Sequence, residues 1–232
     1  MSRKAFVVLI CLVFVGNVSA QGNKKDKKKR PRTKNPVVAP IKADPKLPHV
    51  LLIGDSISMG YTLPTRKLLK GKANVHRIPT NGGPTIRGVE MIDKWLGDRK
   101  WDVIHFNWGL HDLKMDSKGR HQVPLQQYKK NLSQLVERMK GQTKVLIWAS
   151  TTPVPQGKVK PPRKDSDVIA YNKVAAEIMK KHDVKVNDLY SFVLPNLSKL
   201  QRPVNVHFRP GGSAALARQV ASKIEAALAG QK

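Results

Sequence analysis

His49-Val-Leu-Leu-Ile-Gly-Asp-Ser-Ile-Ser58 is the segment from which the architecture of this chain follows. After His49, four aliphatic residues form a short run, which favours a buried strand. The glycine that comes next permits a tight turn, and Asp55 can cap a following helix. The sequence therefore predicts a strand over residues 49–53, a turn, and a helix over residues 59–70.

The same alternation of short apolar runs and amphipathic stretches continues to the end of the chain. Strands that alternate with helices pair in parallel through βαβ units. We therefore predict an α/β protein, a three-layer α/β/α sandwich with a five-stranded parallel sheet. Ligands of such sheets bind beyond the carboxyl ends of the strands. The further expected strands are 73–78, 102–106, 144–149 and 184–187, and the further expected helices are 85–97, 124–140, 166–181 and 213–229.

Residues 1–20 have the pattern of a secretory signal peptide. Arg3 and Lys4 precede an apolar run, and small residues end it at Ala20, after which we expect cleavage. The run is too short for a comfortable membrane span, although an uncleaved anchor is the alternative interpretation. We expect a secreted or periplasmic protein with no transmembrane segment after cleavage. The single cysteine, Cys11, would leave with the signal, so neither a disulfide nor a thiol nucleophile is expected.

Residues 21–46 read as a basic, disordered linker. They hold ten Lys or Arg residues against two Asp, with four Pro and no aromatic residue. The rest, residues 47–232, is long enough for one domain with its own core. The whole chain has a net charge of +27, which favours contact with a polyanion or an anionic cell envelope through the linker. The alternative interpretation is that the charge serves only solubility. No nucleic-acid-binding motif accompanies the charge, so no specific nucleic-acid partner is expected.

Ser56 lies directly after the first predicted strand. A serine hydroxyl becomes an effective nucleophile only when a base takes its proton. A strand-to-helix turn exposes that hydroxyl and aims the backbone N–H of Ser56, at a helix N-terminus, towards a developing oxyanion. The simpler interpretation of Asp55 and Ser56 is a helix cap, where both residue types are common.

The Gly54-Asp55-Ser56 sequence after a first strand resembles block I of the SGNH/GDSL hydrolases. Three further segments, in the family's order, extend the resemblance over residues 48–228 and imply the flavodoxin-like SGNH fold. In that family the block I serine is the nucleophile and the block IV histidine is its base, which implies these roles for Ser56 and His207. The three segments are Asn81-Gly-Gly-Pro-Thr85, Asn107-Trp-Gly-Leu-His-Asp112 and Val204-Asn-Val-His-Phe208.

The resemblance also implies an oxyanion hole. Backbone N–H groups of Ser56 and Gly83 would contribute, with Gly82 as the alternative glycine. His111 stands where the family has an asparagine, and a neutral imidazole still offers one N–H donor. Asn107 is the alternative side-chain donor. We expect the neighbouring Trp108 to line the substrate pocket.

The acid of the family's triad is missing, because Val204 stands where the aspartate is expected. A valine side chain cannot accept the hydrogen bond that orients the imidazole of His207. Three groups could replace it: a main-chain carbonyl near Val204, the side-chain oxygen of Asn205, or the more distant Asp188. We favour a Ser-His dyad supported by the main-chain carbonyl.

These residues predict an esterase that works through an acyl-serine intermediate. The resemblance implies substrates such as O-acetyl or short acyl groups on a small molecule or polysaccharide, and a lysophospholipase-like or thioesterase-like enzyme is an alternative. A catalytically inactive SGNH-fold surface protein that binds polyanions is the other. No cofactor is required, and the histidines lack the spacing of metal ligands.

Overall fold

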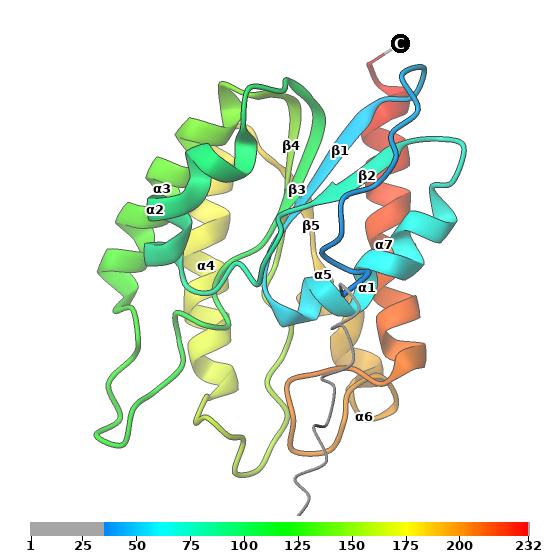
Figure 1. Ribbon diagram of the computed structural model, residues 1–232. Helices are drawn as coiled ribbons and strands as arrows, with labels where there is room; N and C mark the ends of the chain where they lie inside the picture. Colours follow the sequence, from blue (N-terminus) through cyan, green and yellow to red (C-terminus); the bar gives the residue numbers. More distant parts are fainter. Residues whose placement is uncertain (1–34, 232) are drawn as a thin grey trace, which may run out of the picture. The chain divides into compact units, whose positions relative to one another are not determined.

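The computed structural model describes residues 35–231, so the predicted signal peptide and most of the predicted linker lie outside the described residues. One five-stranded parallel sheet has the strand order β2-β1-β3-β4-β5. The predicted three-layer α/β/α architecture is confirmed (Figure 1). Its strands are β1 (His49–Ile53), β2 (Asn74–Arg77), β3 (Trp101–Phe106), β4 (Thr143–Ala149) and β5 (Lys185–Asn187).

Helices cover both faces of the sheet. Helices α1 and α7 pack together on one face, and α2, α3 and α4 form the layer on the other (Figure 1). Within residues 35–231, no helix has the length and apolar character needed to cross a membrane. The helices are α1 (Ser56–Leu68), α2 (Thr85–Leu96), α3 (Leu125–Lys140), α4 (Asp165–Lys181), α5 (Leu189–Val193), the 3₁₀ helix η1 (Leu194–Asn196), α6 (Leu197–Leu200) and α7 (Pro210–Ala229).

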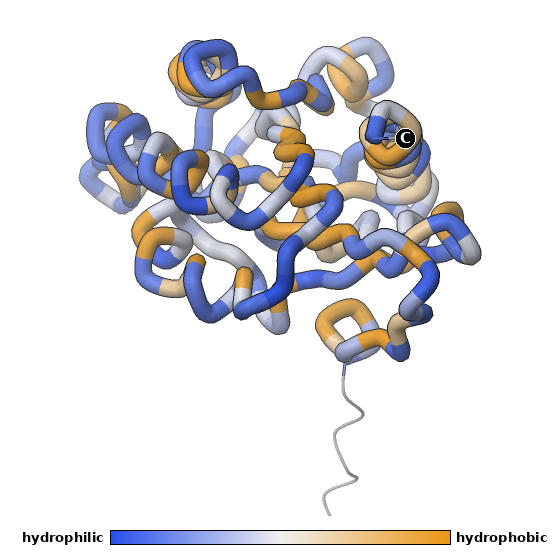
Figure 2. Tube along the Cα trace, turned by 90° about the horizontal axis from the view of Figure 1, so that it is seen from above, coloured by the Kyte–Doolittle hydropathy of each residue, from blue (hydrophilic) through white to orange (hydrophobic). Residues whose placement is uncertain are grey.

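The centre of the sheet forms the core. The last four residues of β1 are fully or almost fully buried, as expected of a parallel strand covered on both faces. Figure 2 shows apolar residues of the strands in the middle of the molecule, with hydrophilic residues frequent along the helices around them. The burial fixes the strands, and therefore also the positions of the loops at their carboxyl ends.

Two helices begin earlier than the sequence pattern indicates. Helix α1 begins at Ser56 instead of residue 59, because Asp55 accepts the backbone N–H of Ile57 at 2.9 Å and caps the first turn. Helix α7 begins at Pro210 instead of residue 213, since proline fits the first helical position. The short helices between residues 189 and 200 were not predicted, because each is too short to show a helical period.

Residues 35–46, the last part of the predicted linker, are hydrogen-bonded to side chains of α1 and β2. Arg66 Nη1 donates to the carbonyl of Pro36 at 2.9 Å, and Asn74 Nδ2 donates to the carbonyl of Asp44 at 2.8 Å. Polar side chains of the domain thus hold this segment through its main-chain carbonyls.

Candidate active site

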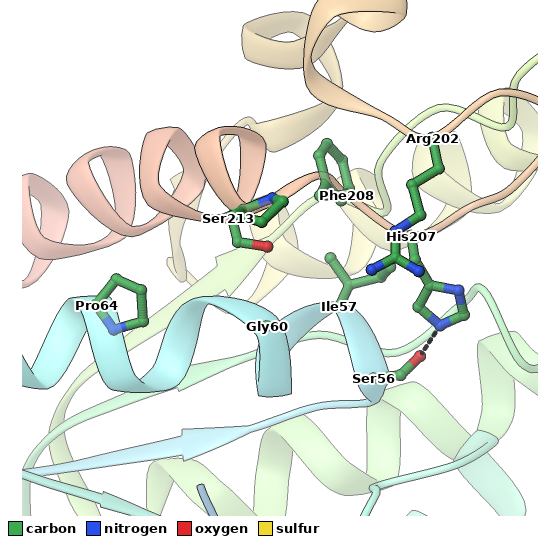
Figure 3. A pocket seen from close by; sticks show the side chains of 9 residues that line it. Ser56, Ile57, Gly60, Pro64, Arg202, His207, Phe208 and Ser213 are labelled. Carbon is green, nitrogen blue, oxygen red and sulfur yellow. Dashed lines mark hydrogen bonds between the residues drawn. The ribbon is translucent and has the colours of Figure 1, made fainter.

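The segments singled out in the sequence meet at the carboxyl edge of the sheet. Ser56 directly follows the β1 turn, Gly83 follows β2, His111 follows β3, and His207 lies just before α7. A cavity of about 540 Å³ opens beside Ser56 and His207 (Figure 3). Among the residues that line it are Ser56, Ile57, Arg202, His207, Phe208 and Ser213.

Ser56 and His207 contact each other directly, although 151 positions separate them in the sequence. The distance between Ser56 Oγ and His207 Nε2 is 2.9 Å (Figure 3). Ser56 is the first residue of α1, and its backbone N–H has no acceptor within residues 35–231. The hydroxyl therefore lies within reach of a base, and a free N–H lies on the same residue.

Asn205 holds the other side of the histidine ring. Its side-chain oxygen Oδ1 accepts the backbone N–H of His207 at 2.9 Å and lies 2.8 Å from His207 Nδ1. A backbone N–H can only donate, so this atom is the amide oxygen, and Nδ1 must carry the ring proton that it accepts. Nε2 consequently has its lone pair towards Ser56, as a general base requires.

The support that we favoured for His207, a main-chain carbonyl near Val204, is therefore not the one observed. Val204 has φ of +49°, is exposed, and points its side chain towards Gly157. The more distant candidate, Asp188, instead accepts the hydroxyl of Ser150 at 2.8 Å and caps α5. Of the three groups considered, the structure selects Asn205.

The environment of His207 favours the neutral imidazole. Partial burial of the ring lowers the pKa of His207 below its usual value of 6.5, and the positive charges of Arg202 and Arg163 lower it further, against the opposing effect of Asp55. A neutral Asn205 cannot raise this pKa as a carboxylate would. The ring is thus in its basic form at neutral pH.

A buried arginine that the sequence analysis missed supports the turn of residues 54–56, the nucleophile turn, from beneath. Arg77 donates to the carbonyls of Gly54 at 2.8 Å and Asp55 at 3.2 Å, and to the hydroxyl of Ser58 at 2.7 Å. Burial lowers the pKa of Arg77 to about 10, so it is still charged at neutral pH. A charged residue inside a short strand was the signal that could have revealed it.

The backbone N–H of Gly83 already has a partner. Gly83 has φ of +63°, and its N–H donates to the side-chain oxygen of Asn81 at 2.9 Å. The N–H of the alternative residue, Gly82, donates to the carbonyl of Gly54 at 3.0 Å. In this structure an amide oxygen therefore occupies the donor that was expected to hold an oxyanion.

His111 lies beside the nucleophile turn. Its Nε2 is 3.9 Å from Asp55 Oδ2, which is too long for a hydrogen bond but close enough for charge interaction. Burial lowers the pKa of His111, partly opposed by Asp55, so the ring is neutral at neutral pH and retains one N–H donor.

Asn107, the alternative oxyanion donor, has a different role. Its Nδ2 donates to the carbonyl of Ala149 at 2.8 Å and to Thr151 Oγ1 at 3.2 Å, which joins the ends of β3 and β4. Trp108 does not line the cavity, as we had expected, but is buried in the core with 1% of its surface exposed. Both residues therefore support the structure of the loop after β3.

Asp112 fixes the loop after β3 to the start of α2. One of its carboxylate oxygens accepts the backbone N–H of Thr85 at 2.8 Å and also the hydroxyl of the same residue. Burial raises the pKa of Asp112 to about 7. No cluster of three or more potential metal ligands occurs among the described residues 35–231.

Gly109 is required where the loop passes β4. It has φ of +146°, and a Cβ added there would clash with Thr151 Oγ1, the atom that Asn107 binds. We expect Gly109→Ala to reduce the free energy of unfolding by about 3 kcal/mol or more, because the clash adds to the backbone strain. Urea denaturation measures this change.

The control is Gly119→Ala, at a glycine with φ of +74° and no atom within 4 Å of the added Cβ. It isolates the backbone cost, which we expect to be about 1 kcal/mol. Equal losses in the two variants would show that the contact with Thr151 is unimportant.

A serine hydroxyl hydrogen-bonded to an oriented imidazole, at the carboxyl edge of a parallel sheet, is the arrangement that serine hydrolases share. A model of the GDSL-like lipase/acylhydrolase family matches residues 52–215, and the chain belongs to this family. The search of curated proteins gives no match.

Solved structures of low sequence identity share the fold. A lipase/acylhydrolase from Enterococcus faecalis superposes with a TM-score of 0.67 at 20% identity, over 77% of this chain and 96% of that one. The acetyl xylan esterase AlAXEase gives 0.65 at 15% identity, over 76% and 99% of the two chains. Axe2, an acetylxylan esterase from Geobacillus stearothermophilus, gives 0.64 at 21% identity, over 76% and 94%.

Proposed function

We propose that this protein hydrolyses carboxylic esters, with Ser56 as the nucleophile, His207 as the general base and Asn205 as the residue that orients His207. The observation that carries the proposal is the continuous hydrogen-bonded chain from Ser56 Oγ through the His207 ring to Asn205 Oδ1, with contacts of 2.9 and 2.8 Å. It has the geometry and the tautomer that proton removal from the serine needs.

In the proposed reaction, His207 Nε2 takes the hydroxyl proton while Ser56 Oγ bonds to the ester carbonyl carbon. The negative oxygen of the tetrahedral intermediate is held by the backbone N–H of Ser56 and by the His111 ring. The N–H of Gly83 joins them once the Asn81 side chain turns away. His207 then protonates the departing alkoxide, the alcohol leaves, and the acyl group remains on Ser56.

Water releases the acyl group by the same steps in reverse order. His207 Nε2 takes a proton from the water, the resulting hydroxide adds to the acyl carbon, and the proton returns to Ser56 Oγ as the carboxylic acid leaves. Asn205 Oδ1 accepts from Nδ1–H throughout, which stabilises the imidazolium without supplying a negative charge.

We propose O-acetyl or short acyl groups on carbohydrate as the substrates. The cavity has room for a sugar-sized ligand, and two of the structural neighbours described above act, by their names, on acetylated xylan. The pattern of residues 1–20 supports a secreted or periplasmic location, and the basic residues 21–34 offer contact with a polyanion.

Labelling with a fluorophosphonate probe tests the proposal, because the probe reacts only with an activated serine. We expect the wild-type protein to be labelled, Ser56→Ala to stay unlabelled, and p-nitrophenyl acetate to be cleaved faster than long-chain esters. The neutral Asn205 in place of an acid favours one competing function, an inactive polyanion-binding protein. A folded wild-type protein that is not labelled and hydrolyses neither p-nitrophenyl acetate nor the long-chain esters would contradict the esterase proposal and favour that alternative.

A further inference from the structure

Two arginines from different loops carry positive charge close enough to His207 to lower its pKa. Arg202 lies in the loop before α7 and lines the cavity, and Figure 3 shows its side chain extending beside His207. Arg163 lies in the loop before α4, where its Nε donates to the carbonyl of Leu110, the residue preceding His111, at 2.8 Å. The proposed reaction uses neither guanidinium.

Neither arginine has an acidic partner within the described residues 35–231. The carboxylate of the nucleophile turn, Asp55, is only 4% exposed, and one of its oxygens already accepts the N–H of Ile57. It therefore reduces the positive charge of the site but offers little surface to a substrate. Many surface lysines within residues 35–231 are also unpaired. What sets the two arginines apart is that Arg202 lines the cavity and Arg163 is bonded to the loop that carries His111.

Hydrogen bonds hold the side chain of Arg163 and the backbone of Arg202. Arg163 has a second bond, from Nη1 to the carbonyl of Pro161 at 3.2 Å, and its Nη2 has no hydrogen-bond partner within residues 35–231. The backbone N–H of Arg202 donates to the carbonyl of His207 at 2.9 Å, which fixes the origin of its side chain relative to the base. The N-termini of α1 and α7 lie at the same cavity and add partial positive charge.

A guanidinium binds a carboxylate or a sulfate through paired N–H donors, and does so more strongly where few competing anions are present. We propose that Arg202 and Arg163 form an anion subsite that selects esters of acidic sugars, whose alcohol portion carries a carboxylate or a sulfate near the scissile ester. The inference rests on the proposed esterase function and names its substrate class.

Three matched substrates test the subsite: methyl glucoside, methyl glucuronide and methyl glucoside 6-sulfate. Each is acetylated at the same ring hydroxyls, and the three differ only in the group at carbon 6. We measure kcat/KM for acetate release by wild type, Arg202→Gln and Arg163→Gln. We expect each substitution to lower the ratio of kcat/KM on the anionic substrate to kcat/KM on the neutral substrate by about tenfold. This change corresponds to the loss of one charge-assisted hydrogen-bonded pair. The carboxylate and sulfate arms show which of the two anions the subsite prefers.

Arg218→Gln is the matched control, because it removes one charge from an exposed position on α7, outside the residues that line the cavity. It should leave the ratio unchanged. Arg163→Lys should retain part of the preference, and added salt should reduce the preference of the wild type. If the arginine variants keep the wild-type ratio, or lose activity equally on all three sugars, the subsite is wrong and the esterase proposal stands.

A binding measurement separates the subsite from the chemistry. Calorimetry with Ser56→Ala and the acetylated glucuronide should show salt-sensitive binding, and adding Arg202→Gln should weaken it about tenfold. If wild type hydrolyses no ester but this difference in binding persists, the esterase proposal fails while the subsite remains. If Ser56→Ala binds the acetylated glucuronide no more tightly than the double variant with Arg202→Gln, the subsite proposal fails.

Discussion

Replacing Ser56 by alanine is expected to lower kcat/KM for p-nitrophenyl acetate by about 10⁴-fold or more. The serine oxygen forms the bond to the acyl group, and within residues 35–231 no other hydroxyl is hydrogen-bonded to the His207 ring. His207→Ala should cause a loss of similar size, and the double variant should be little worse than either single one, because the two residues act as one unit. Stopped-flow or steady-state release of p-nitrophenol measures all three.

Ser213→Ala provides the control, since this serine lines the same cavity but is not bonded to His207. It should keep kcat/KM within about threefold of wild type, the range of an ordinary surface substitution. Independent, additive losses from Ser56→Ala and His207→Ala would contradict the proposed pair. So would a Ser56→Ala protein that still turns over.

Asn205→Asp is expected to raise kcat/KM by about tenfold. Asn205 already holds the ring in the correct tautomer, since its oxygen also accepts the backbone N–H of His207 at 2.9 Å. The change therefore adds only the difference between a neutral and a charge-assisted hydrogen bond to the imidazolium, about 1–2 kcal/mol. Asn205→Ala removes the orientation itself and should lower kcat/KM about 10- to 100-fold.

The pH profile gives the same substitution a second readout. Activity needs neutral His207, so kcat/KM falls as the pH drops through the pKa of this ring. Burial holds that pKa below 6.5 in the wild type, which places the acid limb below pH 6.5. A carboxylate at position 205 stabilises the imidazolium, raises the pKa of His207, and should move the acid limb to higher pH.

Val204→Asp distinguishes the structure from the family pattern. The side chain at position 204 points towards Gly157, whereas Asn205 occupies the hydrogen bond to Nδ1. We therefore expect no increase in activity from an acid at position 204. A gain with Val204→Asp, together with no gain and an unshifted profile for Asn205→Asp, would show that the loop around His207 has another arrangement.

The sequence was sufficient for the sheet and for the meeting of Ser56 with His207. Short apolar runs placed every strand within about one residue, since a buried parallel strand has a strong local signature. The strands depend on residues close together in the chain. The pairing of Ser56 with His207 came instead from the resemblance of Gly54-Asp-Ser and of the histidine before the last helix to blocks I and IV of the family.

The remaining features of the site depend on where side chains point in three dimensions. Whether Val204 or Asn205 supports the histidine is decided by one left-handed backbone residue, φ of +49°, which no periodicity reveals. Arg77 has its role because β2 lies next to β1 and beneath its turn. Asn107 has a side-chain amide that could donate to an oxyanion, but this amide already donates to the carbonyl of Ala149.

The exposed position of the histidine also affects what happens after the alcohol has left. His207 lies at the surface, and bulk water therefore has ready access to the acyl-serine. Water at about 55 M would then compete strongly with any second sugar for the acyl group, unless that sugar binds in place. We expect the intermediate to be short-lived, with hydrolysis exceeding acyl transfer to free sugar alcohols. Chromatography of the products formed with excess xylose would reveal any transfer that contradicts this.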